Sequence, residues 1–279
     1  MGRTLVTGSS GFIGSRLVKR LDSSDVITDS DNSSRIDLAD RNQVLRLGSA
    51  DTVIHLGGRT PKNGIPWSEY FENNVSATLN ILEYCKKNKS RNLIYASSYV
   101  YGKPNSCPID ESHQVRPHNA YTESKYIGER LCRFYCDRTD LSVTILRPFN
   151  IFGKSMRDGY LISNLVSSAK TGKETTITNK DSKRDFLYVD DFVDLLLRIK
   201  DHDSKFEIFN VGSGQSHSFA EVAEKIQDIA GEKLSIRYEQ DMESYIPDIR
   251  ADISKIKGAT GWQPKVKFED GLRQVFDSF

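Results

Sequence analysis

The sequence predicts an α/β chain, in which a doubly wound parallel sheet is followed by a smaller C-terminal lobe. Over the first half of the 279 residues, short apolar runs rich in β-branched residues alternate with amphipathic stretches. Continuous apolar strands separated by helices indicate a parallel sheet that is covered on both faces. Right-handed crossovers between such strands make the doubly wound order the expected topology.

The expected elements follow one another in a regular order. Strands are predicted at 4–8, 25–28, 51–56, 91–97 and 141–148, and helices at 11–21, 75–87 and 121–138. Glycines interrupt this pattern beyond Asn150. There we expect helices near 160–170 and 218–230, and a strand at 206–212 that returns to the sheet. We therefore assign residues 1–150 and 186–212 to the sheet domain, and residues 151–185 and 213–279 to the lobe.

Composition excludes several classes of protein. The chain has 39 Lys+Arg against 38 Asp+Glu, a net charge of +1, which argues against a dedicated binder of nucleic acid or of anionic membranes. No apolar stretch approaches the roughly 18 residues of a membrane span. The N-terminus shows no leader, so we expect a cytoplasmic protein. The four cysteines fit no zinc spacing, so we expect reduced thiols and no metal site.

A glycine-rich turn follows the first predicted strand. Gly8, Gly11 and Gly14 form a G-x-x-G-x-x-G pattern between this strand and the next helix. Glycines at these positions permit a tight turn and a close approach of the backbone to a pyrophosphate, which the positive end of the helix then faces. The sequence therefore predicts a dinucleotide site.

The second predicted strand ends in two acids, Asp29 and Asp31. An acid at this position binds the adenosine ribose hydroxyls, and the spacing does not choose between the two. Its charge would repel a 2′-phosphate, which favours NAD over NADP. Arg16 and Arg35 lie close enough in the sequence to keep NADP possible.

Tyr121 and Lys125 lie four residues apart on one face of a predicted helix. Tyrosine titrates near pKa ~10, and lowering this pKa by about three units requires roughly 4 kcal/mol. A lysine ammonium and an oxidised nicotinamide ring would supply that energy. Ser97 ends an earlier strand, where its hydroxyl would bond to the substrate oxygen whose proton Tyr121 takes. The alternatives are a surface Tyr–Lys pair and a serine that caps a turn.

Ten motifs in order give the chain its resemblance to a known family. The motifs are "TGSSGFIGS", "IDLAD", "VIHLGG", "NNVSATLNILE", "SSYVYG", "YTESK", "LRPFNIFG", "RDFLYVDD", "FNVGSG" and "ADISK" with "GWQP". Over nearly its whole length the sequence resembles the extended short-chain dehydrogenase/reductase superfamily. Within it, the chain is most similar to NAD-dependent nucleotide-sugar epimerases and dehydratases of the UDP-glucose 4-epimerase type. The resemblance implies that the parallel sheet is a Rossmann sheet and that the lobe binds substrate.

The resemblance also assigns roles to residues. It implies cofactor contacts along the whole NAD molecule, at Gly8, Gly11, Phe12, Ile13, Gly14, Asp37, Leu38, Leu56, Gly57, Gly58, Asn74, Tyr121, Lys125 and Pro148. It implies a catalytic triad of Ser97, Tyr121 and Lys125. For substrate contacts it implies Ser97, Ser98, Tyr121, Asn150, Arg184 and Arg250.

The implied function is 4-epimerisation of a nucleoside-diphosphate sugar through transient oxidation at C4. The 4,6-dehydratases of the family carry Asp-Glu after the catalytic hydroxyl residue, and this chain has Ser98 and Tyr99 there, so a dehydratase is not expected. One alternative is an NAD(P)H-dependent reductase of a 4-keto sugar. Another is a non-catalytic NAD sensor or scaffold, which intact Tyr121, Lys125 and Ser97 disfavour.

The resemblance further implies a homodimer. In the family, the helices that correspond to 75–87 and 121–138 pair across a two-fold axis. Both segments carry apolar residues at helical spacing, and part of each stripe must cover the sheet.

Overall fold

The computed structural model describes residues 2–30, 35–62, 64–202 and 204–279. The chain forms two compact units. The first unit comprises Met1–Gly102, His113–Pro148 and Val193–Phe209, and the second comprises Lys103–Ser112, Phe149–Phe192 and Asn210–Phe279.

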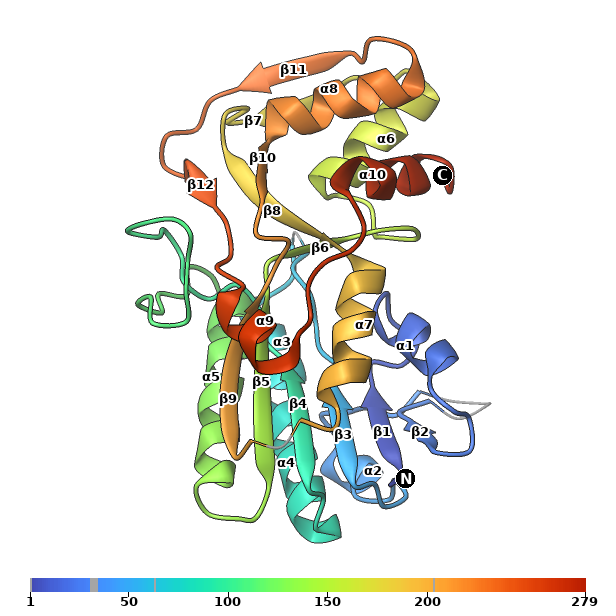
Figure 1. Ribbon diagram of the computed structural model, residues 1–279, viewed down its shortest axis with the longest axis vertical. Helices are drawn as coiled ribbons and strands as arrows, with labels where there is room; N and C mark the ends of the chain where they lie inside the picture. The colour runs from blue at the N-terminus through green and yellow to red at the C-terminus, as the bar shows by residue number, and fades with distance from the viewer. Residues whose placement is uncertain (1, 31–34, 63, 203) are drawn as a thin grey trace. The chain divides into compact units, whose positions relative to one another are not determined.

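The sheet of the first unit has the strand order β2-β1-β3-β4-β5-β9 (Figure 1). Its strands are β1 (Thr4–Thr7), β2 (Val26–Thr28), β3 (Thr52–His55), β4 (Asn92–Ala96), β5 (Ser142–Pro148) and β9 (Phe206–Val211). The pairs from β2 through β5 are parallel. The chain first adds β2 on one side of β1 and then β3 on the other, so the order reverses between β1 and β3. In sheets of this kind, ligands bind at the carboxyl ends of the strands near such a reversal.

Helices connect these strands. They are α1 (Gly14–Arg20), α2 (Arg41–Val44), α3 (Trp67–Tyr70), α4 (Ala77–Asn88), α5 (Ala120–Cys136) and α7 (Val189–Ile199), whose residues from Val193 onward belong to this unit. A π-helical turn, η1 (Phe71–Ser76), joins α3 to α4. The segment predicted as one helix at 75–87 is therefore longer and contains a π turn, because the 3.6-residue period of apolar positions does not report a local change of hydrogen-bond pattern.

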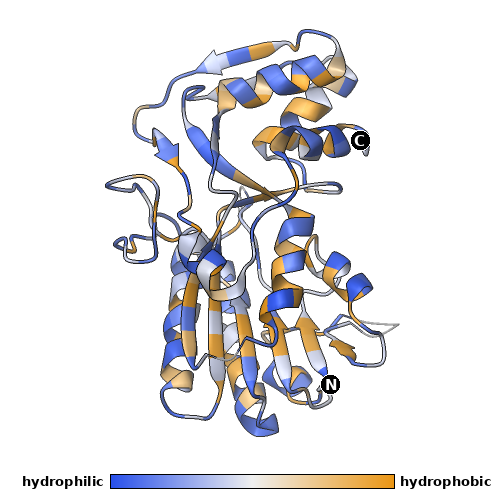
Figure 2. Ribbon diagram, viewed as in Figure 1, coloured by the Kyte–Doolittle hydropathy of each residue, from blue (hydrophilic) through white to orange (hydrophobic). Residues whose placement is uncertain are grey.

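Apolar side chains of the strands and helices form the core of the first unit. Leu5, Val53, Leu93 and Val143 each contribute a buried side chain from a different strand, and Ile81 contributes one from α4. Figure 2 shows the strands as largely hydrophobic along their length. Burial on both faces explains why these strands read as continuous apolar runs in the sequence.

The second unit is built around β8 (Lys183–Tyr188), which pairs with β6, β10 and β12. The other strands are β6 (Asn150–Phe152), β7 (Thr175–Thr178), β10 (Ser216–Ser218), β11 (Ile236–Glu239) and β12 (Asp248–Ile249). The helices are α6 (Leu161–Thr171), α8 (Phe219–Ala230), α9 (Ser254–Thr260) and α10 (Phe268–Phe276). Phe152, Phe186, Tyr188 and Phe268 pack ring against ring in its core. In the part of the chain that the structure describes, no helix is long and apolar enough to cross a membrane.

Candidate active site

Several candidate residues follow the carboxyl ends of four neighbouring strands in the first unit. Gly8 follows β1, Leu56 follows β3, Ser97 follows β4, and Pro148 is the last residue of β5. Because these strands are parallel and adjacent, their carboxyl ends lie along one edge of the sheet. The structure therefore brings together groups that the sequence separates by 140 residues.

The glycine-rich turn has no room for a side chain at Gly8 or Gly14. Gly8 has a φ of +68°, and a Cβ there would lie 2.8 Å from the backbone nitrogen of Gly57. A Cβ at Gly14 would overlap the carbonyl oxygen of Gly8. A side chain at either position would force the turn apart, so both positions require glycine.

Asp29 is fully buried and bonds to this turn. It accepts the backbone N–H of Gly8 at 2.6 Å, the backbone N–H of Ser9 at 3.0 Å and the Ser9 hydroxyl at 2.6 Å. Asp29 thus fixes the loop, a task that the sequence did not reveal. Asp31, the other candidate for the ribose contact, lies outside the described residues.

Loops next to the turn carry further candidate residues. Leu38 is buried against the turn that follows β3, where a Cβ at Gly57 would overlap its side chain. Asp37 accepts the backbone N–H of Ala39 at 2.9 Å. The structure places Leu38 beside Gly57, two residues for which the resemblance implies cofactor contacts.

Lys125 is a buried amine on α5. It is 6% exposed, and its Nζ lies 4.4 Å from the centroid of the Tyr95 ring. Burial lowers the pKa of the Lys125 amine to about 8. Tyr121 lies one turn earlier on α5, with the ring of Tyr70 edge-on at a centroid distance of 6.1 Å. A capping box between Asn119 and Thr122 fixes this first turn of the helix.

Ser97 donates its hydroxyl proton to a buried carboxylate. Its Oγ lies 2.5 Å from Oε1 of Glu129, which is one helical turn after Lys125. Arg147 of β5 binds the same carboxylate through Nε at 3.0 Å and Nη2 at 2.6 Å, and donates from Nη1 to the Tyr101 hydroxyl at 2.8 Å. A carboxylate only accepts, so the single proton of Ser97 is committed to Glu129. The Oγ lone pairs are left to accept from a substrate hydroxyl.

The ion pair of Glu129 and Arg147 was not predicted from the sequence. Both side chains are 4% exposed. Two signals were available: Glu129 follows Lys125 by four residues, and Arg147 interrupts an otherwise apolar strand. Charged side chains are buried only when paired, so an arginine within a central strand indicates a buried acid.

Asn74 connects the loop after β3 with α5. Its Oδ1 accepts the Arg59 N–H at 2.6 Å, and its Nδ2 donates to the Arg59 carbonyl at 3.2 Å and to the Ser124 hydroxyl at 2.8 Å. A Cβ at Gly58 would lie 2.8 Å from the Asn74 Oδ1. Asn74 therefore holds the loop next to Gly58 against the turn of α5 that carries Lys125.

In the second unit, Asn150 and Arg184 lie on paired strands. Asn150 donates from Nδ2 to the Asp185 carbonyl at 2.9 Å. Arg184 donates from Nη1 to the carbonyls of Lys183 and Ile246 at 2.8 and 3.0 Å. Its guanidinium lies 5.2 Å from the centroid of the Phe219 ring.

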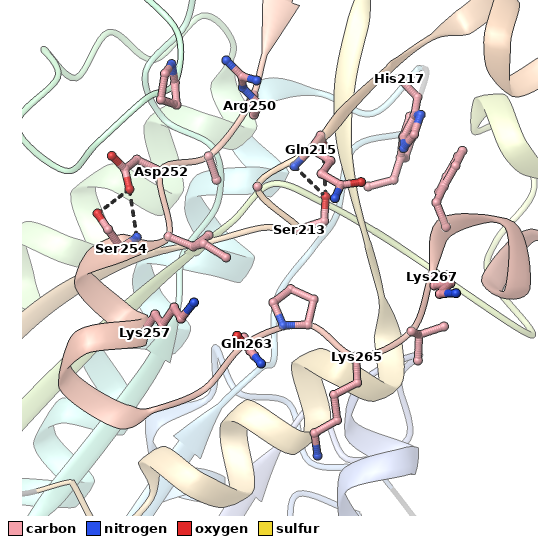
Figure 3. Close-up of a pocket in the computed structure, with 18 of the residues that line it drawn as sticks. Ser213, Gln215, His217, Arg250, Asp252, Ser254, Lys257, Gln263, Lys265 and Lys267 are labelled. Atoms are coloured by element: carbon pink, nitrogen blue, oxygen red, sulfur yellow. Dashed lines mark hydrogen bonds between the residues drawn. The ribbon is translucent and has the colours of Figure 1, made fainter.

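Arg250 follows β12 and lines a pocket of about 860 Å³ that lies within the second unit. Figure 3 shows this pocket, with Arg250 opposite His217 and Lys257. The Arg250 Nε is buried and has no hydrogen-bond partner among the described residues. A buried donor without a partner is a group that a ligand can satisfy.

Asp185, also fully buried, holds the loops beside Arg250. It accepts the N–H and hydroxyl of Ser213 at 2.6 and 2.7 Å, the N–H of Gly214 at 3.0 Å and the N–H of Ala251 at 3.1 Å. Burial raises the pKa of this carboxyl, against the effect of these hydrogen bonds. No local pattern around Asp185 indicates this role.

Comparison with known proteins places the chain among nucleotide-sugar enzymes. A model of the NAD dependent epimerase/dehydratase family matches residues 4–212. UDP-glucuronic acid decarboxylase 6 of Arabidopsis thaliana is 30% identical over 306 residues, covering 99% of this chain and 88% of the relative. A putative UDP-glucose 4-epimerase of Methanocaldococcus jannaschii is 29% identical, covering 97% and 96%. GDP-6-deoxy-D-mannose reductase of Pseudomonas aeruginosa is 29% identical, covering 99% and 97%.

Solved structures are similar over the same length. MoeE5 in complex with UDP-glucuronic acid and NAD has a TM-score of 0.89 at 26% identity, covering 99% of this chain and 98% of that one. RMD from Pseudomonas aeruginosa, complexed with NADPH, has a TM-score of 0.90 at 28% identity, covering 100% and 98%. These likenesses confirm the predicted doubly wound α/β fold.

Proposed function

The chain belongs to the NAD dependent epimerase/dehydratase family, and from that premise we propose that it is a 4-epimerase of a nucleoside-diphosphate sugar. It is an enzyme of the extended short-chain dehydrogenase/reductase type, as its relatives are. The observation that carries the proposal is the arrangement on α5 and β4. A buried lysine lies one turn from Tyr121, and a serine beside them has its proton committed elsewhere.

The glycine-rich turn fits a dinucleotide. Because a Cβ at Gly8 or Gly14 would strike backbone atoms, the turn is clear of side chains where a pyrophosphate has to approach. The residues that would hold NAD in the first unit are Gly8, Gly11, Phe12, Ile13, Gly14, Leu38, Gly57 and Gly58. When bound, NAD would supply a hydride acceptor for C4 and, once reduced, a hydride donor to the keto group.

The residues of the chain move the proton. Tyr121, as phenolate, takes the proton of the sugar O4, and the positive charge of Lys125 favours the phenolate. The Oγ of Ser97 accepts from the same hydroxyl while that proton is still on O4, because Ser97 donates its own proton in a hydrogen bond to Glu129. In the reverse step Tyr121 returns the proton to O4.

We assign recognition of the nucleotide diphosphate to the second unit. Asn150, Arg184 and Arg250 are the donors proposed for it, and the unpartnered Nε of Arg250 supports this assignment most directly. An arginine suits a phosphate because its fork of donors matches two oxygens at once.

The cofactor is proposed to be NAD in preference to NADP. Asp29 is bonded to the glycine turn, and Arg16 donates to the Phe12 carbonyl at 2.7 Å. The preference therefore rests on the negative charge at the end of β2, which would repel a 2′-phosphate. Calorimetric titration of both cofactors tests this proposal. Equal or tighter binding of NADP would favour the alternative reductase, which the reductase relative and the similarity to the NADPH-bound RMD structure support.

One experiment separates the candidate reactions. The protein is incubated with UDP-glucose, UDP-glucuronic acid and GDP-linked 4-keto sugars, with NAD or NADPH, and products are identified by mass spectrometry and NMR. An epimerase yields the 4-epimer without net change in cofactor redox state. Net consumption of NADPH would identify a reductase, and release of CO₂ from UDP-glucuronic acid would identify a decarboxylase like the plant relative.

The homodimer is also a proposal. Leu79 on α4 and Phe134 on α5 are 39% and 51% exposed, and a hydrogen bond from Tyr135 to Glu83 joins the two helices. An isologous contact through α4 and α5 would bury these side chains. Phe134→Asp should convert a dimer to a monomer by light scattering, whereas Met242→Asp, at a 72% exposed position of the second unit, should not. A wild-type monomer at micromolar concentration would overturn the proposal.

The chain is further proposed to work in the cytoplasm. All four cysteines, Cys85, Cys107, Cys132 and Cys136, are free thiols among the described residues. Reduced thiols suit that compartment.

A further inference from the structure

A chain of buried hydrogen bonds runs through the first unit. It begins at the N–H of Gly57, which donates to the Thr7 hydroxyl at 3.2 Å. The Thr7 hydroxyl lies 2.6 Å from Nδ1 of His55, and Nε2 of His55 lies 3.3 Å from the Thr78 hydroxyl. The Thr78 hydroxyl donates to the Asn74 carbonyl at 2.7 Å. The side chains of Thr7, His55 and Thr78 are all buried.

The donor and acceptor in each of these hydrogen bonds follow from the last bond, which ends at the Asn74 carbonyl. A backbone carbonyl only accepts, so the single hydroxyl proton of Thr78 lies on the bond to Asn74. Thr78 must then accept from His55, which places a proton on Nε2. Burial and the nearby charge of Lys125 lower the pKa of His55 to about 3, so the ring is neutral and its Nδ1 carries no proton. The Nδ1 therefore accepts from Thr7, whose oxygen in turn accepts from Gly57.

This series of hydrogen bonds ends where the backbone hydrogen bonding changes from π-helical to α-helical. Asn74 lies in the π-helical turn η1, and its carbonyl also accepts the N–H of Ala77. A π turn breaks the regular i→i−4 ladder, so its carbonyls need other partners. The hydroxyl of Thr78 supplies one. The side chain of Asn74 then reaches Ser124, the residue before Lys125.

We propose that His55, as the neutral Nε2–H tautomer, is a positioning residue that acts through Thr78 to hold Asn74 and thereby the Lys125 turn of α5. This role rests on the proposed function, since it concerns the geometry of the same candidate catalytic residues. Both ends of the hydrogen-bond series lie at the proposed site. Gly57 lies in the loop proposed to line the cofactor, and Asn74 holds that loop through Arg59.

The first test reads the tautomer in the intact wild-type protein. In long-range ¹H–¹⁵N spectra of the ¹⁵N-histidine-labelled protein, the signals of His55 are identified by their loss in His55→Gln. We expect the Nε2–H pattern and no titration at mildly acidic pH. An Nδ1–H pattern, or protonation near the ordinary pKa of about 6.5, would overturn the proposal. This readout needs no substrate, so it stands or falls separately from the proposed reaction.

The second test removes one hydroxyl without changing shape. Thr78→Val takes away the donor to Asn74, and we expect kcat to fall about tenfold to a hundredfold because the catalytic turn shifts slightly, with KM nearly unchanged. Thr78→Ser keeps the hydroxyl and should restore most of kcat. Thr144→Val, at a buried position of β5 outside the hydrogen-bond chain, is the matched control and should leave kcat unchanged.

Thermal unfolding of each variant confirms that it is folded at the assay temperature. An unchanged kcat in folded Thr78→Val, or an equal loss in Thr78→Ser, would overturn the proposal. If Thr78→Val does not fold, the tautomer of His55 in the wild-type protein decides. If the wild-type protein converts no nucleotide sugar, the proposed reaction fails while the tautomer test still decides the placement of the protons.

Discussion

The two units hold their candidate residues in different ways. In the first unit, Ser97 and Lys125 are buried, Ser97 is bonded to Glu129, and Lys125 lies over an aromatic ring. In the second unit, Arg184 and Arg250 are partly exposed, and Arg250 keeps a donor without a partner among the described residues. Groups proposed to move protons are thus held in place by the fold, whereas Arg250, which is proposed to bind phosphate, retains one donor without a partner among the described residues. We therefore expect substitutions of the candidate residues in the first unit to lower kcat, and substitutions of the two arginines in the second unit to raise KM.

Each of the two units also contains a buried aspartate that holds a loop in place. Asp29 in the first and Asp185 in the second are both fully buried, and each accepts backbone N–H groups from a glycine-containing loop. A buried carboxylate that accepts several such bonds fixes loop geometry without presenting charge to solvent. The two units therefore hold a glycine-containing loop in the same way and differ in how their candidate side chains are held.

The largest effect is expected from Tyr121→Phe. Removing the hydroxyl abolishes proton transfer, so kcat should fall by about two to four orders of magnitude. The affinity for NAD, measured by calorimetry, should stay nearly the same because the glycine turn is untouched. Near-normal turnover by the variant would remove Tyr121 from its proposed role.

Glu129→Gln tests the buried pair behind Ser97. It leaves Arg147 buried without a charged partner, so the free energy of unfolding in urea should fall by about 3–5 kcal/mol. The double variant Glu129→Leu/Arg147→Met removes both charges and should regain most of that stability. Its kcat should be low, because a leucine side chain at position 129 offers the Ser97 hydroxyl no acceptor. Recovery of kcat together with stability would contradict the orientation of Ser97 by Glu129.

Arg250→Ala and Arg184→Ala should mainly raise KM for the nucleotide sugar. Losing a charge-assisted contact to phosphate corresponds to about a tenfold to hundredfold change, with a smaller change in kcat. The larger increase in KM is expected for Arg250, because Arg184 already donates hydrogen bonds to two backbone carbonyls. Steady-state kinetics of the two variants measure this order, and an unchanged KM in both would move phosphate recognition away from these arginines.

The smallest effect concerns pH. Since burial lowers the pKa of Lys125 to about 8, the ammonium that favours the Tyr121 phenolate is lost as pH rises through that value, and kcat should decline there. Arginine stays protonated throughout, so Lys125→Arg should move this alkaline decline upward by about one pH unit or more, at some cost in kcat at neutral pH. A decline that does not move in the pH profile of the variant would assign it to another group.

Much of the first unit could be predicted from the sequence, because its signals are local. Apolar runs gave the strands, and three glycines between a strand and a helix gave the turn. The four-residue spacing of Tyr121 and Lys125 placed both on one turn of α5. In the second unit, the helix expected at 218–230 is α8, which begins after its N-cap residue Ser218.

The remaining features depend on contacts between distant segments. Glu129 and Arg147 lie 18 residues apart, and Ser97 lies 32 residues before Glu129, so only the folded sheet brings them together. Asp29 and Asp31 were both candidates for the ribose contact, because a strand end shows only where an acid lies and not which donors surround it. Asp185 accepts N–H groups from segments 28 and 66 residues away, which no local pattern indicates.

The π turn limits which changes of chain length this protein can accept. A π turn holds one more residue than the α-helical turn it replaces, so deleting a single residue from Phe71–Ser76 would restore a continuous α-helix through α3 and α4. Everything before the deletion would then rotate by about 100° about the helix axis. Tyr70 would swing away from the ring of Tyr121. A shortened homologue could therefore keep every named motif and still lose the packing around its tyrosine.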